Sequence, residues 1–576
     1  MTLTTVNPTA TVNSALSMRT HAFVDVEGDS ERGRKNRPVL LSIAGSDSAG
    51  LAGIQMDIRS CQALGVHAAT AITATTAQNS QSVLSINPLA AEVLGQQIDA
   101  ALSLQPQVIK IGLLCNHQQI DMLVTKLTDL TIPIVYDPVL SSSSGQRFID
   151  TELIEVIKQQ LLPLCRFVTP NLMEAEELTG LTIRSLGDRE LAAKALSAHL
   201  PEHQPSWVMI KGGHAEGELM LDYCFKGKCF KGKCIKETGS SDKLSFWLGH
   251  KKIATEHNRG TGCALSSSIA CALARGYDDR DALVIAKMAI QQGLRLASAC
   301  NGLTGAAAIK HFPTGDWPVV IVNDTVNTTS KLNVSESLRP FPPCNQPGEQ
   351  SQLGLYPVVD SARWLERLLP LGITTAQLRI KHLRGETLAR EIETAVTLGK
   401  HYNCRLFIND HWQLAIEKGA YGVHLGQEDL QSADLQQIYR AGLRLGISSH
   451  CHYEVARALA VKPSYIACGP TFATTTKDMP WIPHGIEGLC YWQRALPDYP
   501  LVSIGGINTD NLDAIANTGV SGIAMITAIT LANDPEATTL GLMQTIEKAR
   551  PPASVVKTDR LKLADVNNKT QALNDE

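Results

Sequence analysis

VLLSIAGSDSAGLAGIQM, residues 39–56, decides how the first half of the chain folds. Residues 39–43 are a short apolar run, which predicts a buried strand. Glycine-rich residues 45–53 follow, and a helix is expected from about Ile54. A strand, a glycine loop and a helix in this order are typical of a βα unit whose loop amides can approach a ligand. One such loop is weak support for a function, so its meaning depends on the rest of the chain.

Short apolar runs alternate with helical segments over residues 37–320, which predicts an α/β domain with a parallel sheet covered by helices. Further strands are expected at residues 108–111, 132–136, 167–169 and 207–210. Residues 321–352 are rich in Asn, Ser, Pro and Gln, and this composition predicts a linker. A long flexible linker argues against a fixed alignment of two active sites.

Eight apolar runs, each followed by a plausible helix, organise residues 353–548. They lie near residues 353–359, 375–380, 405–408, 421–425, 443–447, 464–468, 500–504 and 521–526. Eight βα units in a segment of this length predict a (β/α)8 TIM barrel. Residues 1–36 and 549–576 are expected to be a flexible N-terminal extension and a polar C-terminal tail.

The composition limits the class of partner. The chain has 576 residues, 44 % hydrophobic content and a formal net charge of -4, without long runs of Lys or Arg. This balance favours small-molecule substrates over nucleic acid or a membrane surface, and a homo-oligomer is left open. The 14 cysteines are scattered, which predicts reduced thiols and a cytoplasmic protein. Ser/Thr-rich residues 1–22 leave an organellar leader as the alternative.

Polar residues follow several predicted strands of the first half, at the sheet edge where open α/β folds bind ligands. Asp137 follows one strand, Asn171 and Glu174 follow another, and Lys211 follows a third. The carboxylates could hold Mg²⁺, and the lysine could meet the charge of a phosphate.

A second glycine-rich turn, Gly260-Thr261-Gly262-Cys263, precedes an apolar helix that runs to Arg275. Free amides at the start of this helix would stabilise negative charge on a phosphoryl group in transfer. The thiol pKa of Cys263 is expected to fall in this position. Taken alone, a tight turn before a core helix explains the motif equally well.

Together these motifs resemble the hydroxymethylpyrimidine/phosphomethylpyrimidine kinases of the ribokinase superfamily over residues 37–315. Gly-Ser-Asp at 45–47, Ala-Gly-Ile-Gln at 52–55, Thr-Ala-Gln-Asn at 76–79 and Gly-Thr-Gly-Cys at 260–263 fall in the family order. The resemblance implies a pyrimidine site and ATP as phosphoryl donor. It assigns the pyrimidine to Gln78, Gly45, Asp47, Thr76 and Leu113, an anion hole to Gly260, Gly262 and Cys263, and nucleotide and metal to Asn171, Glu174 and Lys211. The family usually has His where this chain has Arg259.

Cys224, Cys229 and Cys234 recur at intervals of five residues within a duplicated Cys-Phe-Lys-Gly-Lys segment. Three cysteines could suggest a metal site, but structural zinc usually takes four ligands. The repeat predicts a duplicated hairpin turn at the surface.

Polar residues of the second half cluster at the expected carboxyl ends of the barrel strands, where TIM-barrel active sites lie. Asp410 and Asp429 suit a Mg²⁺ ion shared with a diphosphate. The oxygens of that diphosphate suit the cations and hydroxyls of Arg379, Lys381, Ser448, Thr474, Thr476 and Lys477. A second anion site is expected after strands seven and eight, at Gly505, Gly506, Ile526 and Thr527.

This arrangement is similar to thiamine-phosphate synthase from residue 355 to about 529. The matching motifs are Tyr-Pro-Val-Val-Asp at 356–360, Gln-Leu-Arg at 377–379, Phe-Ile-Asn-Asp at 407–410 and Gly-Val-His-Leu-Gly-Gln-Glu-Asp at 422–429. The resemblance implies that a thiazole phosphate displaces pyrophosphate from hydroxymethylpyrimidine diphosphate, with Lys477 and Mg²⁺ binding the leaving group. It places Gln377, Asn409 and His424 at the substrate.

The kinase product would then be the synthase substrate, which predicts a bifunctional enzyme of thiamine biosynthesis. The alternative is a vitamin B6-type kinase fused to a thiazole tautomerase or to a non-catalytic phosphate-binding barrel. Against this alternative, a tautomerase has no need for a complete set of diphosphate-binding residues.

Overall fold

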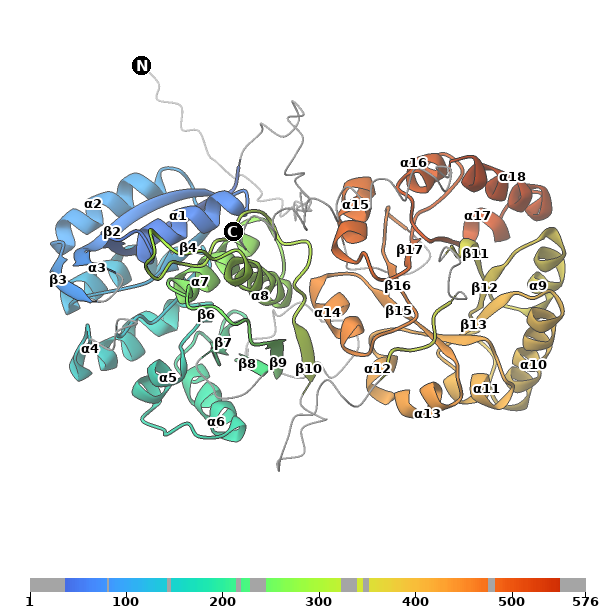
Figure 1. Ribbon diagram of the computed structural model, residues 1–576, viewed down its shortest axis with the longest axis horizontal. Helices are drawn as coiled ribbons and strands as arrows, with labels where there is room; N and C mark the ends of the chain where they lie inside the picture. The colour runs from blue at the N-terminus through green and yellow to red at the C-terminus, as the bar shows by residue number, and fades with distance from the viewer. Residues whose placement is uncertain are drawn as a thin grey trace, which may run out of the picture.

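The computed structural model describes residues 37–79, 82–141, 147–213, 219–227, 245–322, 339–344, 352–474 and 482–549. Figure 1 shows an open sheet with its helices in the first half of the chain and a closed ring of strands in the second. Among the described residues, no helix combines the length and the apolar character needed to cross a bilayer.

The first domain is built on a ten-stranded sheet in the order β10-β9-β8-β7-β6-β5-β4-β1-β2-β3. Its strands are β1 (Val39–Asp47), β2 (His67–Gln78), β3 (Val83–Pro88), β4 (Val108–Ile111), β5 (Ile134–Tyr136), β6 (Phe167–Val168), β7 (Trp207–Ile210), β8 (Leu219–Lys226), β9 (Ser245–Lys251) and β10 (Val319–Val322). The predicted parallel pairing is confirmed from β2 through β7. It is wrong at the edges, where β3, β8, β9 and β10 pair antiparallel.

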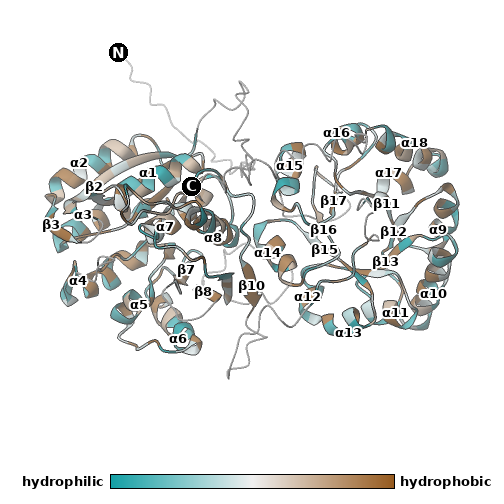
Figure 2. Cartoon of the chain, in the orientation of Figure 1, coloured by the Kyte–Doolittle hydropathy of each residue, from teal (hydrophilic) through white to brown (hydrophobic). Residues whose placement is uncertain are grey.

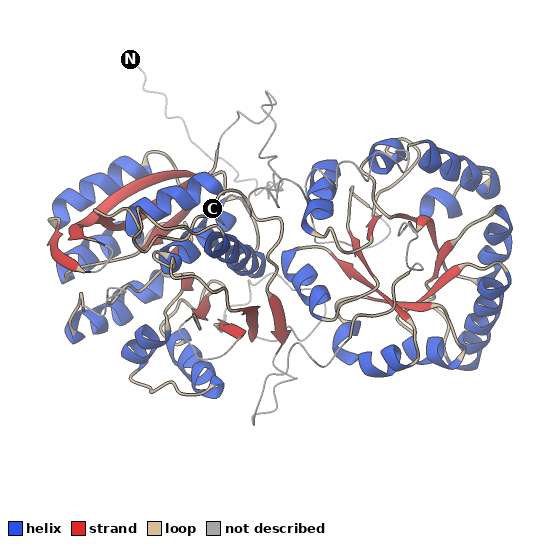
Figure 3. Ribbon diagram, in the orientation of Figure 1, coloured by secondary structure: helices blue, strands red, loops and turns tan. Residues whose placement is uncertain are grey.

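Helices cover both faces of this sheet (Figure 3). They are α1 (Gly53–Ala63), α2 (Ala91–Leu102), α3 (His117–Leu127), α4 (Thr151–Val156), α5 (Leu172–Thr179), α6 (Leu186–Ser197), α7 (Thr261–Ala274) and α8 (Asp279–Arg295). Val108 packs in the core shared with α7 and α8, whereas its neighbour Ile109 packs in the core on the opposite face. Helix α7 is apolar almost all round and is therefore buried.

The second domain is a closed barrel of eight parallel strands, as predicted. The strands are β11 (Gly354–Val359), β12 (Thr375–Leu378), β13 (Arg405–Asn409), β14 (Gly422–Leu425), β15 (Arg444–Ser449), β16 (Tyr465–Cys468), β17 (Leu501–Ile504) and β18 (Gly522–Met525). The helices are α9 (Ala362–Leu368), α10 (Gly385–His401), α11 (Trp412–Glu417), α12 (Asp429–Ser432), α13 (Leu435–Arg440), α14 (His452–Ala460), α15 (Gly485–Ala495), α16 (Leu512–Asn517), α17 (Thr527–Thr530) and α18 (Pro535–Lys548). Each expected strand coincides with an observed one within a few residues.

The two domains touch directly, along α8 and β10 on one side and α14 and α15 on the other. Strand β10 is strongly apolar and lies beside the barrel (Figure 2). The amide of Tyr453 donates to Asp281 Oδ1 at 2.8 Å, and the Tyr491 hydroxyl donates to the carbonyl of Pro313 at 3.0 Å. A flexible linker gave no reason to expect these direct contacts.

Part of the predicted linker also has a defined place. Phe341 is buried, and its amide donates to the carbonyl of Lys462 at 3.0 Å on the barrel surface. The first two residues of the predicted linker, 321 and 322, belong to strand β10, which ends at Val322. Residues 1–36 and most of the tail lie outside the described residues, and the domain boundaries stay predictions.

Candidate active sites

The first glycine loop is held by Asp47, whose side chain is almost fully buried. Its carboxylate accepts hydrogen bonds from the amides of Ala49, Leu51 and Ala52, each at 2.8 Å. A side chain at Gly53, where φ is +57°, would put its Cβ 2.2 Å from the carbonyl oxygen of Gly45. Asp47 therefore shapes the loop, and its direct contact with a substrate stays a prediction.

The second glycine turn packs against this loop. Gly260 has a φ of +70°, and a Cβ there would lie 2.2 Å from the carbonyl oxygen of Leu51. The turn leads into α7, whose first amides have no partner within the helix itself because of helix geometry. The two glycine segments thus form one compact unit, which puts free amides beside the first loop.

The predicted fall in the pKa of Cys263 is wrong. Burial raises the pKa of this thiol to about 11, and the neighbouring Lys110 ammonium does not reverse the effect. Position in the first turn of a helix favours the thiolate, but loss of hydration is the larger influence here. The raised pKa favours the thiol over the thiolate, and the part of Cys263 in the anion hole stays a prediction.

Asp137 and Lys211 meet at the mouth of the turn. The Lys211 ammonium donates to Asp137 Oδ1 at 2.7 Å and lies 3.8 Å from the carboxylate of Glu174. Burial works to raise the pKa of Asp137, but Lys211 overrides it and holds this pKa below its usual value. A Cβ on Gly262 would lie 3.4 Å from Lys211 Nζ, so the ammonium lies close to the glycine turn.

Asn171 and Glu174 form the N-terminal capping box of α5. Asn171 Oδ1 accepts from the amide of Glu174 at 2.9 Å, and Glu174 Oε2 accepts from the amide of Asn171 at 2.7 Å. Burial raises the pKa of Glu174 to about 7 in spite of Lys211. These contacts explain the local fold, and a role of either residue at ATP stays a prediction.

The expected pyrimidine residues lie along the other side of the first loop. Thr76 Oγ1 donates to the carbonyl of Ser46 at 3.0 Å, and the backbone of Gln78 exchanges hydrogen bonds with the Ser48 hydroxyl at 2.9 Å. A Cβ on Gly45 would meet the Leu113 side chain at 3.1 Å. The structure thus brings all five predicted pyrimidine residues to one edge of the sheet.

A buried ion pair below the turn was not anticipated. Lys110 and Asp57 are both fully buried and approach to 2.9 Å, and the hydroxyls of Ser42 and Ser267 also donate to Asp57. A lysine within the apolar Val-Ile-Lys-Ile strand was the available signal, because buried lysines are almost always paired.

In the barrel, Asp410 and Asp429 come together at the ends of β13 and β14. Burial and the charge of Asp410 raise the pKa of Asp429. Asp410 also pairs with Lys381 and accepts from the side-chain amide of Asn409. Its backbone is left-handed, with φ +62°, a conformation that is uncommon for non-glycine residues but that Asp adopts more readily than most.

A chain of hydrogen bonds crosses the barrel interior through His424. Its Nε2 lies 2.8 Å from Ser448 Oγ, and its Nδ1 lies 2.7 Å from the hydroxyl of Tyr465. Tyr465 bonds to Tyr356 at 2.8 Å, and Gln377 donates to Tyr356 at 3.3 Å. Burial lowers the pKa of His424 to about 4, so the ring is neutral. The sequence pointed to His424, Ser448 and Gln377 but not to the tyrosines that join them.

The predicted second anion site lies where β16, β17 and β18 end. Gly505 and Gly506 have φ values of +98° and +66°, and a Cβ on either would collide with the loop after β16. Arg379, Thr474 and Ile526 are half-buried, and Thr527 is exposed at the start of α17. Thr476 and Lys477 lie outside the described residues, so their assignments remain untested.

The cysteine repeat is described only at its start. Cys224 is buried within β8, where it lies opposite Met209 of β7. The expected surface position is therefore wrong for Cys224, because this residue belongs to a strand paired on both sides. Cys229 and Cys234 lie outside the described residues, so the hairpin turn stays a prediction for them.

The first domain is an α/β domain with a glycine turn, and the second is a barrel with a paired-carboxylate site. Together they define the class of the protein as a two-domain transferase that acts on phosphorylated molecules. The phosphomethylpyrimidine kinase family model matches residues 47–307, and the thiamine monophosphate synthase model matches residues 355–529. A solved phosphomethylpyrimidine kinase from Clostridium difficile 630 is 32 % identical and covers 43 % of this chain and 95 % of its own, with a TM-score of 0.35.

The second half is similar to the thiamine-phosphate synthase of Serratia proteamaculans, with 56 % identity over 201 residues, which is 35 % of this chain and 95 % of that protein. The Photorhabdus laumondii enzyme is 52 % identical over 198 residues, 34 % of this chain and 92 % of that protein. The chain belongs to the thiamine-phosphate synthase family. With its kinase domain it is a bifunctional enzyme of thiamine biosynthesis, which sets aside the alternative of a B6-type kinase fused to a tautomerase.

Proposed function

We propose that the first domain transfers phosphoryl groups from ATP to hydroxymethylpyrimidine and to its monophosphate, and that the barrel condenses the resulting diphosphate with a thiazole phosphate. The observation that carries this proposal is that each domain has its own set of candidate anion-binding residues. The kinase turn offers amides and one lysine, whereas the barrel offers a carboxylate pair and a second phosphate site.

In the kinase, Lys211 would hold the phosphates of ATP, and the amides of Thr261, Gly262 and Cys263 would accept the charge that develops on the transferred group. Gln78 would orient the pyrimidine so that its hydroxymethyl oxygen faces the turn. Asp137 is hydrogen bonded to Lys211 and fixes its ammonium in place. Asp137 remains the metal candidate, but much of its charge is balanced by Lys211.

In the barrel, the residues fit a divalent cation, since burial and the nearby charge of Asp410 both raise the pKa of Asp429. A Mg²⁺ ion bound there would neutralise part of the diphosphate charge. Lys381, Arg379 and Lys477 would hold the diphosphate oxygens, while Gly505 and Gly506 would hold the thiazole phosphate. Neutral His424 would keep Ser448 oriented toward the pyrimidine without adding charge.

The experiment is a one-pot assay of the full chain with ATP, Mg²⁺, hydroxymethylpyrimidine and thiazole phosphate, following thiamine phosphate. Asp410→Asn should accumulate the pyrimidine diphosphate, and Asp137→Asn should form product only when that diphosphate is supplied. Lys194→Gln, an exposed change on α6, serves as the control. If the wild type makes no thiamine phosphate from supplied diphosphate, the barrel assignment is wrong.

A further inference from the structure

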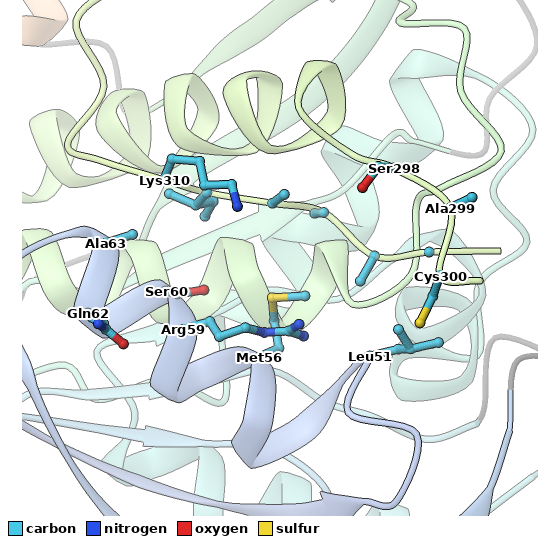
Figure 4. Close-up of a pocket in the computed structure, with 15 residues that line it drawn as sticks. Leu51, Met56, Arg59, Ser60, Gln62, Ala63, Ser298, Ala299, Cys300 and Lys310 are labelled. Carbon is cyan, nitrogen blue, oxygen red and sulfur yellow. The ribbon is translucent and has the colours of Figure 1, made fainter. Parts of the chain in front are cut away.

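A cavity of about 620 Å³ lies beside the glycine turn of the kinase domain and contains none of the proposed site residues. Helix α1 forms one wall, and residues 298–300 and 305–310 form the other (Figure 4). Sites for small organic molecules usually span roughly 300–1,000 Å³. The cavity is therefore large enough for a metabolite.

Its charge favours an anion. Arg59 and Lys310 project from opposite walls in Figure 4, and the lining includes no Asp or Glu. Arg59 donates to the carbonyl of Gly50. Among the residues that the structure describes, neither cation has a carboxylate partner. Two positive charges without a counter-charge on one cavity attract a negatively charged ligand.

A third polar group points to the same kind of ligand. Ser60 lines the cavity and is 1 % exposed, and its hydroxyl has no hydrogen-bond partner within the described part of the chain. Buried hydroxyls are normally bonded, so this one has an unused donor and acceptor. The rest of the lining is largely apolar, from Leu51, Met56 and Ala63 on one side to Ala306, Ala307 and Ile309 on the other.

The walls of the cavity also hold the catalytic turn. The amide of Ala307 donates to the carbonyl of Arg259 at 3.1 Å, and the amide of Arg259 donates to the carbonyl of Gly305 at 3.4 Å. Leu51, on the opposite wall, is the residue against which Gly260 packs. A ligand between these segments would bear on the backbone that positions the turn.

We propose that this cavity binds an organic phosphate and thereby acts on the kinase turn. The phosphate would bond to Arg59, Lys310 and Ser60, and a flat apolar body would lie against the alanine-rich wall. A phosphorylated product of the barrel and a nucleotide share this chemistry, so the experiment has to separate them.

Pyridoxal phosphate serves as a labelling probe, because its aldehyde condenses with a lysine amine with loss of water and borohydride reduces the imine to a stable amine. In the full chain, peptide mapping should show Lys310 labelled at least tenfold faster than Lys194. Arg59→Gln should remove most of that preference, whereas Arg390→Gln, a matched exposed change on α10, should leave it. Equal labelling of Lys310 and Lys194 would overturn the proposal.

Protection identifies the ligand. Thiamine phosphate, ADP and inorganic phosphate are titrated against the labelling of Lys310. We expect one of the two organic phosphates to protect at a concentration at least tenfold below that of inorganic phosphate, and which one does so names the source. Equal protection by all three would show that the apolar wall contributes nothing and would overturn the organic-phosphate assignment.

The effect on the turn is measured as ADP release from hydroxymethylpyrimidine and ATP, with thiazole phosphate omitted. If thiamine phosphate is the protecting ligand, it should change this rate at least twofold in the wild type and not in the Arg59→Gln/Lys310→Gln variant. If ADP is the protecting ligand, pre-added ADP should inhibit the Arg59→Gln/Lys310→Gln variant at least twofold less than it inhibits the wild type. A rate response that is the same in both proteins would refute the link to the turn.

Discussion

One carboxylate of each active site, Asp137 in the kinase and Asp429 in the barrel, is held in an opposite electrostatic state. Asp137 of the kinase lies 2.7 Å from Lys211, whose charge keeps the pKa of Asp137 low despite burial. Asp429 of the barrel lies near a second carboxylate, Asp410, and its pKa is raised by burial and by that neighbour. Lys211 balances Asp137, whereas Asp410 and Asp429 have Lys381 as a shared charged neighbour, so their site keeps negative charge that a further cation would relieve. Both sites bind phosphates, so phosphate binding alone does not determine how the charge of a site carboxylate is balanced.

The largest effect should come from removing the cation that balances the kinase site. Lys211→Gln should lower the rate of ADP release about 100- to 1,000-fold, because a charged donor to the phosphates is lost. The barrel reaction, measured in the same preparation from supplied diphosphate, should not change. Lys194→Gln is the matched control. If the rate of ADP release fell less than tenfold, Lys211 would balance the charge of Asp137 without contributing to phosphate binding.

The barrel side of the comparison depends on a neutral His424. The folded pKa of His424 is about 4, below the unfolded value of 6.5, so protonation favours the unfolded chain. The free energy of unfolding is therefore unaffected above pH 6.5 and falls as the pH drops from 6.5 to about 4. Between these values the wild type should lose roughly 3 kcal/mol more than His424→Gln. Urea unfolding of both proteins at the two pH values checks this, and parallel pH profiles would contradict it.

Magnesium should distinguish the two sites directly. Because the folded pKa of Asp429 is raised, its ionised form costs stability above that pKa, and the cost is relieved as the pH falls or as a cation binds. At a free Mg²⁺ concentration about 100-fold above the dissociation constant, the barrel should gain about 2.7 kcal/mol. Asp429→Asn should be more stable than the wild type without metal and should lose this gain.

Thermal unfolding with and without Mg²⁺ measures the gain, and Asp513→Asn, an exposed change on α16, is its control. If Asp137→Asn removed the stabilisation by Mg²⁺ and Asp429→Asn did not, the cation would bind in the kinase site and not in the barrel site.

The smallest effect concerns the contact between the regions compared. Tyr491→Phe removes the hydroxyl that bonds to Pro313 and lies 2.7 Å from His452 Nε2. The free energy of unfolding should fall by about 1 kcal/mol. Tyr402→Phe, at an exposed position, should change nothing measurable. Equal stability of the two variants would mean that the domains are not coupled through this bond.

Much of the fold could be predicted because its signals are local. Each barrel strand is an apolar run with its own turn residues, and β4 and β7 were expected at their observed bounds. Strand direction is not written in such runs, so the antiparallel edge from β8 to β10 was missed. The direct contact between domains was missed for a related reason, since a polar linker reveals nothing about the surfaces at its two ends.

The site residues show the same limit. Motif order brought Asp410, Asp429 and His424 forward, and the structure does place the two carboxylates together. The pKa of Cys263 was predicted in the wrong direction because its helix position is visible in the sequence, whereas its burial is a property of the assembled core. Tyr465 carried no signal beyond its place in a strand, yet Gly446 leaves the space that its ring fills.

The contact between the domains also bears on how the enzyme can be dissected. Tyr453, Tyr491 and Trp492 on the barrel are buried in a cluster that continues into Tyr277 and Phe312 of the kinase. A barrel cut free at the linker would present these aromatic rings to water, and the separated kinase would present their counterparts. Exposed aromatic surfaces of this kind promote self-association. The two domains should therefore be produced as one chain, because each shields the apolar surface of the other from water.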